Sequence, residues 1–322
     1  MMKNPSIAFL IFFLFSGALL ADEPTVTIQG DHLTVVLETE GAQLKSIQHT
    51  STGTEYLWQG DPEYWAERAP NMFPVCVRFK DHQFTYQNQP YEMPFLGLAV
   101  THHFDTTQHR SDFVRQTMVS SSATRVHYPF PFQLDIESEV NGLTLTQRYV
   151  ITNHGTTPMY YALGGHPGFN TPLTHGRTRN DYEIVFSERM TTHRTEIADG
   201  LQQSHRIPFL KNEDRLRLGD ERVPPSGMFL REPPSRQIGI ARTGKNPYVV
   251  VDLGDFPNTN LWTPPGMPYA CIEPMVGHHD LQETLESIEA KPFLIKHPAG
   301  ETRTYAYTIT IVPEEGTPAL SP

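Results

Sequence analysis

Short runs of alternating apolar and polar residues, joined by turn residues, constrain the fold of this 322-residue chain more than any other feature. Residues 134–140 alternate in this way, the pair Asn141-Gly142 follows, and residues 143–150 resume the alternation. An Asn-Gly pair between two such runs is a strong hairpin signal, with both turn residues expected at positive φ. The pattern predicts two antiparallel strands that each bury one face.

Strand-like runs recur along the whole chain, at 25–28, 33–37, 181–186, 237–241, 248–253, 269–272 and 302–312. No long stretch has the apolar period of 3.6 that marks an amphipathic helix, so we expect few, short helices, with 280–290 as the best candidate. The 28 prolines and 22 glycines supply many turns. We therefore predict an all-β fold of antiparallel sheets, forming a large sandwich in a single domain over residues 22–322. Within it, 211–236 is expected to be a long excursion at one rim and 313–322 a loose tail.

Residues 1–21 have the composition of a secretory signal peptide. Lys3 precedes an apolar run that is too short to span a bilayer comfortably and ends in the small residue Ala21. We expect cleavage near Asp22 and export of the mature chain, either to the periplasm or as a secreted protein. An uncleaved membrane anchor is the alternative reading.

Charge and cysteine content narrow the partners. The formal net charge of −11 disfavours binding to nucleic acid or to anionic membranes. Cys76 and Cys271 have no metal-type spacing, and each lies in an apolar run where a buried free thiol is expected. An exported protein could join the two cysteines, so their pairing stays open.

His166 lies in the sequence Gly164-Gly165-His166-Pro167-Gly168. The glycines allow the backbone to bend sharply and the proline fixes φ, so the imidazole is expected to project from a stiff corner. An unperturbed histidine has a pKa near ~6.5, which suits proton transfer in either direction near neutral pH. A purely structural loop histidine is the alternative.

Glu273 is the one acid in the apolar stretch 270–276. Burial of a carboxylate is unfavourable unless it has a partner or a task, and partial desolvation raises its pKa toward that of a general base. A buried structural ion pair is the alternative. A histidine and a carboxylate from distant segments form a minimal pair for acid/base chemistry on a small molecule, so we expect His166 and Glu273 to share one cavity.

Other candidate site residues are weaker. Arg68 could bind sugar hydroxyls or orient the glutamate, or it could form a surface ion pair with Glu67 or Glu63. The aromatic residues that could stack on a sugar ring, with core packing as the alternative, are Trp58, Trp65, Trp262 and Phe169. We expect no metal, because His278-His279-Asp280 and His102-His103 lack ligand spacing, and no cofactor, because no nucleotide-binding glycine motif occurs.

Taken in order, several motifs of the chain resemble those of aldose 1-epimerases, in the galactose mutarotase-like branch that includes the LacX-type proteins. These motifs are Arg68-Ala69-Pro70 with Phe73-Pro74, Gly165-His166-Pro167-Gly168-Phe169, Leu261-Trp262-Thr263, Cys271-Ile272-Glu273-Pro274 with Gly277 and Asp280, and Gly300-Glu301. The resemblance spans about residues 30–312. It implies a β-supersandwich fold and a cofactor-free isomerase (mutarotase) that interconverts the α and β anomers of an aldose.

The resemblance also implies residue roles. Glu273 matches the base that takes the proton of the anomeric hydroxyl, His166 matches the acid that protonates the ring oxygen, and Arg68 matches a substrate-binding arginine. Acid and base would then act in concert from opposite sides of one hemiacetal. Family members usually carry a second histidine in a His-Gly-Phe-Ala segment, whereas this chain has Leu96 at that place; His102 or His103 could substitute for it.

The sequence therefore predicts an exported aldose 1-epimerase that acts on a hexose or on the sugar end of a glycan. The alternative is a non-catalytic or weakly catalytic carbohydrate-binding protein with the same cavity, which the leucine at position 96 motivates. An accessory role in polysaccharide breakdown or export is a third reading.

Overall fold

The structure is a computed structural model that describes residues 24–283 and 286–313. The predicted signal peptide, and the predicted tail beyond residue 313, lie outside the described residues, so cleavage and export stay predictions. Within the described part of the chain, no helix is long and apolar enough to cross a membrane.

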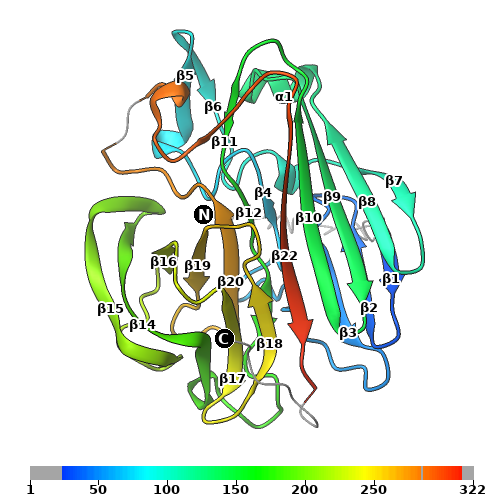
Figure 1. The fold of residues 1–322 in the computed structure, drawn as a ribbon, viewed down its shortest axis with the longest axis vertical. Coiled ribbons are helices and arrows are strands. Elements are labelled where there is room, and N and C mark those ends of the chain that lie inside the picture. Colours follow the sequence, from blue (N-terminus) through cyan, green and yellow to red (C-terminus); the bar gives the residue numbers. More distant parts are fainter. Residues whose placement is uncertain (1–23, 284–285, 314–322) are drawn as a thin grey trace, which may run out of the picture.

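Antiparallel strands make up most of the fold (Figure 1), which confirms the predicted all-β class. The strands are β1 (Thr25–Gln29), β2 (Leu33–Glu38), β3 (Leu44–His49), β4 (Asn71–Met72), β5 (Gln83–Tyr86), β6 (Gln89–Glu92), β7 (Asp105–His109), β8 (Phe113–Val119), β9 (Phe132–Asn141), β10 (Thr144–Asn153), β11 (Met159–Tyr161), β12 (Leu163–Gly165), β13 (Gly168–Asn170), β14 (Tyr182–Ala198), β15 (Leu201–Arg217), β16 (Met228–Arg231), β17 (Gln237–Arg242), β18 (Pro247–Asp252), β19 (Asn258–Trp262), β20 (Tyr269–Val276), β21 (Ile295–His297) and β22 (Thr302–Ile311). The helical segments are α1 (Ser122–His127) and the 3₁₀ turns η1 (Lys80–His82), η2 (Ala99–Thr101), η3 (Arg179–Asp181) and η4 (Ile288–Ala290).

One sheet of 15 strands runs through the described residues, in the order β4-β12-β20-β19-β16-β14-β17-β18-β22-β10-β9-β8-β7. Strand β13 adds to β20, and β15 adds to β14. Figure 1 shows β7–β10 with β22 on one side of the molecule and the curved β14–β15 hairpin on the other. The small sheet β1-β2-β3 contacts β8 and β9 through β1. The site described below lies on the β19–β20 part of the large sheet.

The hairpin predicted from Asn141-Gly142 is confirmed as β9–β10, but its turn is displaced by one residue. Asn141 is the last residue of β9 and pairs with Thr144, so the turn residues are Gly142 and Leu143. Of the two, Gly142 has the positive φ, at 59°. This agrees with a two-residue hairpin loop that has glycine at its first central position.

Two element predictions are corrected by the structure. The predicted helix at 280–290 is, in its described part, only the turn η4, because Asp280 and the residues after it are held by backbone and side-chain bonds to neighbouring segments. The expected excursion at 211–236 begins as strand, since β15 continues to Arg217 by pairing with β14. The register shifts along this hairpin explain why its sequence lacks a clean alternation.

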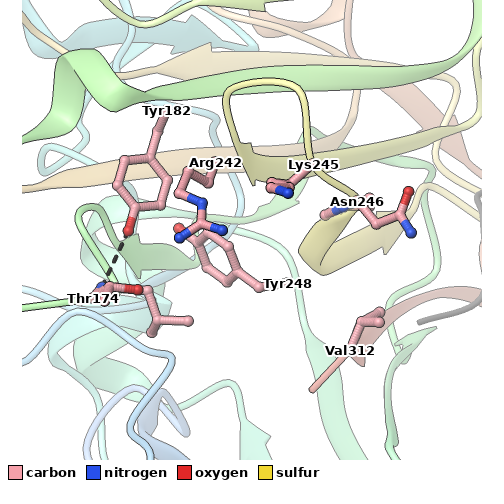
Figure 2. Close-up of a pocket in the computed structure, with 9 residues that line it drawn as sticks. Thr174, Tyr182, Arg242, Lys245, Asn246, Tyr248 and Val312 are labelled. Carbon is pink, nitrogen blue, oxygen red and sulfur yellow. Dashed lines mark hydrogen bonds between the residues drawn. The ribbon is translucent and has the colours of Figure 1, made fainter. Parts of the chain in front are cut away.

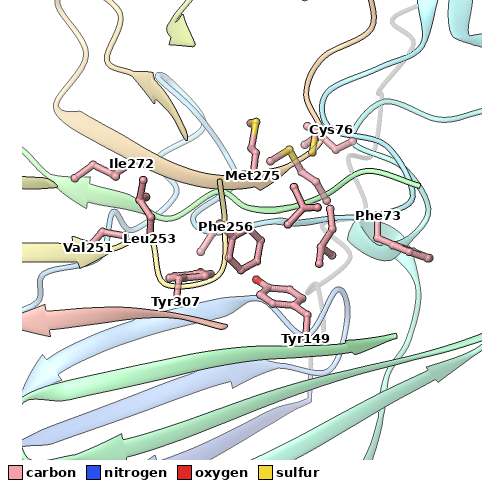
Figure 3. Packing of buried hydrophobic residues seen from close by; sticks show 14 of the residues in the cluster. Phe73, Cys76, Tyr149, Val251, Leu253, Phe256, Ile272, Met275 and Tyr307 are labelled. Atoms are coloured by element: carbon pink, nitrogen blue, oxygen red, sulfur yellow. The ribbon is translucent and has the colours of Figure 1, made fainter. Parts of the chain in front are cut away.

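A continuous core fills the space between the halves of the large sheet (Figure 3), where Tyr149 and Tyr307 approach Phe256. Ile272 of β20 belongs to this core and is fully buried. Successive strand residues point to opposite faces, so the burial of Ile272 in the core directs Glu273 to the other face of the sheet.

Candidate active site

A cavity of about 280 Å³ lies on that other face of β19–β20. It brings together the strand pair, the segment after β12, the segment around residues 95–96 and the turn of the β14–β15 hairpin. Its lining residues are Trp65, Val77, Arg78, Phe95, Leu96, His166, Ile197, Asp199, Gly200, Ser226, Asn260, Trp262, Glu273 and His279.

His166 and Glu273 both line this cavity, as the sequence predicts. The Nε2 atom of His166 lies 3.6 Å from Oε1 of Glu273. His166 is 8% exposed and Glu273 is fully buried, so little water screens the pair. The structure places the two groups side by side, whereas the sequence suggested opposite sides of a hemiacetal.

The glycines before His166 allow close packing, not the sharp backbone bend that the sequence suggested. Neither Gly164 nor Gly165 has a positive φ. A Cβ atom on Gly165 would lie 2.5 Å from the hydroxyl of Tyr307, and one on Gly164 would lie 3.0 Å from the carbonyl oxygen of Pro274. The glycines therefore allow β12 to pack closely against its neighbours, and His166 follows directly from that tightly packed strand.

Glu273 is oriented by its neighbour across the sheet. Asn260 of β19 pairs with Glu273 of β20, and its Nδ2 donates a hydrogen bond of 2.8 Å to Oε1. The second carboxyl oxygen, Oε2, is buried and has no hydrogen-bond partner among the described residues. A buried polar atom left unpaired is unfavourable in a folded protein and marks a position where a ligand can supply the missing partner.

Burial shifts the pKa values of both groups in opposite directions. Desolvation raises the pKa of Glu273 well above its usual 4.5, and the Asn260 hydrogen bond only partly opposes this. Desolvation lowers the pKa of His166 from 6.5 to about 4. The cavity therefore favours the uncharged forms of both side chains.

Aromatic side chains form one wall of the cavity. Trp65 lies 5.0 Å from the His166 ring, and Trp262 lies 5.5 Å from it edge-on. The two indoles meet in a T-shaped contact at 5.3 Å. Trp58 lies behind this wall in a small buried cluster with Tyr269. The structure thus places Trp65 and Trp262 at the cavity, and Trp58 in the packing that supports them.

Two expected site residues do not line the cavity. The Arg68 guanidinium pairs with Glu38 at 3.6 Å, a partner that the sequence did not suggest. Phe169 is fully buried in the core, because its strand β13 pairs with β20, so neither face of its ring is free to stack on a ligand.

Arg78, unlike Arg68, lines the cavity. Its Nη2 donates a hydrogen bond to the carbonyl oxygen of Asp199, at the turn of the β14–β15 hairpin. The sequence does carry a signal for this residue, which follows the apolar run 75–77 as a single charged side chain.

The structure near Leu96 shows whether His102 or His103 lies where the family usually has its second histidine. Leu96 lines the cavity, with a φ of 62°. His102 instead bonds to the carbonyl oxygen of Leu98, and His103 lies by Asp105, so neither imidazole is among the cavity residues. His279, which the sequence suggested only as a rejected metal ligand, is among them.

The two cysteines are free and buried, which confirms the expected buried thiols. Burial and the charge of Glu273 raise the pKa of both Cys76 and Cys271, so neither is disposed to act as a nucleophile. Asp280 accepts bonds from Lys291 and from the backbone of Lys80, a structural arrangement away from the cavity lining. Among the described residues, no group of three metal-ligating side chains is placed to hold an ion.

A second hollow, of about 210 Å³, lies near β17 and β18 (Figure 2). Arg242, Lys245 and Tyr248 line it, and the hydroxyl of Tyr182 accepts a hydrogen bond from the backbone of Thr174. The described residues that line this hollow include no histidine and no carboxylate. This hollow therefore lacks the histidine and carboxylate that the His166–Glu273 cavity contains.

Comparison with known proteins identifies the class to which this fold and cavity belong. The aldose 1-epimerase family model matches residues 24–298. The plasmid-encoded protein LacX of Lactococcus lactis subsp. lactis is 32% identical over 303 residues, which cover 89% of this chain and 99% of LacX. The chromosomal LacX of the same subspecies is 31% identical over the same shares of both chains.

Solved structures agree on the fold. A galactose mutarotase related enzyme from Lactobacillus acidophilus superposes with a TM-score of 0.84 at 24% identity, covering 92% of this chain and 100% of its own. A galactose mutarotase-like protein from Lactobacillus casei gives a TM-score of 0.82 at 23% identity, with 89% and 100% covered. The chain belongs to the aldose 1-epimerase family, and its fold is galactose mutarotase-like. Membership implies a sugar as the molecule that the protein recognises.

Proposed function

We propose that this protein is an aldose 1-epimerase that interconverts the α and β anomers of a hexose. The observation that carries the proposal is the His166–Glu273 pair, 3.6 Å apart in a cavity of about 280 Å³ with an aromatic wall. The anomeric hydroxyl and the ring oxygen of an aldose are bonded to the same carbon. Two neighbouring proton-transfer groups can therefore reach both oxygens at once.

In the proposed reaction, the carboxylate of Glu273 takes the proton of the anomeric hydroxyl. The electron pair of that O–H bond forms the carbonyl of the aldehyde, the bond from C1 to the ring oxygen breaks, and His166 protonates the departing ring oxygen. Rotation about C1–C2 presents the other face of the aldehyde. The ring hydroxyl then attacks C1 as His166 takes back its proton and Glu273 returns one to the carbonyl oxygen, so no atom or charge is gained or lost.

The pKa shifts of the pair set the acid and base strength of its charged form. A raised pKa makes the Glu273 carboxylate a stronger base, and a lowered pKa makes a protonated His166 a stronger acid. Ring opening converts the charged pair into the uncharged pair, which is the state that burial favours. The charged pair that opens the ring is therefore the minor form, with the proton on His166 instead of Glu273, and burial favours the transfers that follow once it has formed.

The remaining polar and aromatic residues of the cavity would hold the sugar. Trp65 and Trp262 offer apolar surface to a sugar face, and Asn260 holds the carboxyl group in place. In this proposal Arg78 takes the binding role that the sequence suggested for Arg68, because Arg78 lines the cavity.

Polarimetry tests the proposal. The optical rotation of freshly dissolved α-glucose and α-galactose, and of a panel of other aldoses, is followed with and without the purified protein. We expect faster relaxation to the same final rotation for at least one sugar. Unchanged relaxation across the whole panel would rule out the epimerase function.

One observation favours a second candidate, a carbohydrate-binding protein with little or no catalysis. Leu96 and Phe95 make one side of the cavity apolar, where the family usually has a histidine. Calorimetry distinguishes the two candidates: saturable sugar binding that Trp262→Ala weakens, combined with no effect on optical rotation, would favour a binding protein over an enzyme.

A further inference from the structure

We propose that His279 binds a hydroxyl group of the sugar and so fixes which aldose the cavity accepts, an inference that rests on the proposed function and adds a specificity residue to it. Nothing in the sequence motifs assigns a role to this side chain. The inference comes from three observations: the position of His279, the lack of a hydrogen-bond partner for its Nδ1, and the apolar Leu96 in the same cavity lining.

The backbone turn after β20 positions His279 at the cavity. Gly277 has a φ of 79°, and a Cβ atom there would lie 2.7 Å from the carbonyl oxygen of Phe293, so glycine is required for the turn. Two residues later, His279 lines the same cavity as Glu273 and is 2% exposed. The adjacent Asp280 accepts a backbone bond from Gln202 of the β14–β15 hairpin, which ties this segment to the cavity's far side.

One ring nitrogen of His279 lacks the partner that a buried histidine normally has. Its Nδ1 is buried and has no hydrogen-bond partner among the described residues. Its nearest aromatic contact is the ring of Phe229, edge-on at 5.8 Å. An unpaired polar group at a cavity is satisfied when a ligand supplies the partner, and a sugar hydroxyl can both donate and accept.

His279 is also kept in the form that suits this contact. Burial, assisted by the nearby His278 and His166, lowers its pKa from 6.5 to about 3, so the ring is neutral near pH 7. A neutral imidazole has one donor and one acceptor nitrogen and can bind a hydroxyl without competing for the proton that His166 transfers. This separates its role from the acid/base pair.

The other wall of the cavity explains why such a residue matters. The side chain of Leu96 can make no hydrogen bond, and the side chains of Phe95 and Val77 in the same lining are apolar as well. Discrimination between sugars that differ in one hydroxyl depends on polar groups that are left unpaired when that hydroxyl is missing. His279 lines this cavity together with His166, and its neutral ring can be the polar group that makes this discrimination.

The test combines a side-chain deletion with a hydroxyl deletion. Sugar affinity and kcat/KM are measured for the wild type, His279→Leu and His279→Gln, with the preferred aldose and its monodeoxy derivatives. We expect His279→Leu to lose about 5- to 20-fold with the parent sugar, the size of one hydrogen bond, and His279→Gln to lose less because its amide still bonds to a hydroxyl. One deoxy sugar should lose a similar factor with the wild type and nothing further with His279→Leu.

The neighbour His278 provides a matched control. It is buried and bonds to the backbone oxygen of His279, yet it does not line the cavity. His278→Asn is expected to leave the ranking of the deoxy sugars unchanged. If His279→Leu does not fold, as judged by its thermal unfolding transition, His279→Gln takes its place in the comparison. The loss of affinity and kcat/KM caused by removing that one hydroxyl should then be smaller in His279→Gln than in the wild type.

The outcomes separate this inference from the proposed function. A wild type that neither binds nor interconverts any sugar overturns both. A wild type that acts on sugars, with every deoxy derivative losing the same factor in the wild type and in the His279 variant, overturns the role of His279 alone.

Discussion

At the scale of single residues, burial is the main influence on the proton-transfer chemistry of the cavity. Glu273 is fully buried with one carboxyl oxygen unpaired, and His166 has a depressed pKa of about 4. Such a pair is unfavourable for stability and useful for proton transfer, a combination that is common at catalytic sites.

Glu273→Gln separates these two effects. Turnover should fall by about 10²-fold or more, because the amide cannot accept the anomeric proton. Stability should rise by about 1 to 2 kcal/mol near neutral pH, because the raised pKa of the folded carboxyl means that its contribution to stability is lost as pH rises above 4.5. Polarimetry and urea unfolding measure the two quantities; an active variant, or one destabilised more as pH rises, would contradict this account of Glu273.

The pH dependence of the rate provides another residue-scale prediction. The reaction needs one transferable proton shared by the His166–Glu273 pair. It should therefore stop at low pH, where the His166 imidazole gains a proton while Glu273 is still protonated, and at high pH, where Glu273 loses its proton. The acidic limb of kcat/KM should therefore lie near pH 4, well below the 6.5 of an ordinary histidine. An acidic limb centred near 6.5 would mean that His166 is not desolvated in the working enzyme.

At the scale of elements, the segment that follows β20 carries His279 and is fixed by a buried ion pair. Lys291 lies 2.7 Å from Asp280, and both side chains are almost fully buried. The carboxylate also accepts backbone bonds from Lys80 and Leu281. This cluster joins three segments of the chain, one of which carries His279.

Lys291→Met should destabilise the fold by about 3 kcal/mol or more, because it leaves Asp280 as a buried charge without its cation. Asp280→Asn combined with Lys291→Met, which removes both charges, should recover much of that loss. Chemical denaturation measures both variants. Equal stability of Lys291→Met and wild type would show that the pair does not hold this segment.

The sequence predicts some of these elements better than others. Alternation within β9–β10 is a local signal, so the hairpin could be read directly, although its turn lies one residue away from the Asn-Gly pair. The walls of the cavity come from tertiary contacts. Arg78 lines the cavity and bonds to the turn of the β14–β15 hairpin, and His279 reaches the cavity after a bend at Gly277, positions that no local pattern predicts. Phe169, by contrast, belongs to a predicted motif but is buried in the core.

At the scale of the whole molecule, one sheet connects most of the described chain. Its 15 strands lie between β4, at residue 71, and β22, at residue 311, and one core cluster packs against it. A sheet shared in this way leaves no boundary at which one part could unfold without exposing the core of the other.

The chain should therefore unfold as one domain, as its sequence predicts. Differential scanning calorimetry is expected to show a single transition in which the calorimetric and van't Hoff enthalpies agree. Two resolved transitions would contradict the single-domain prediction for residues 22–322.

The most direct measurement of the central claim is a crystal structure of the Glu273→Gln variant, slowed enough to trap substrate, with an aldose bound. We predict the sugar in the His166–Glu273 cavity, its anomeric oxygen within hydrogen-bond distance of the side chain at position 273 and its ring oxygen within that distance of His166 Nε2. A sugar bound elsewhere, or one whose C1 faces away from both side chains, would contradict it.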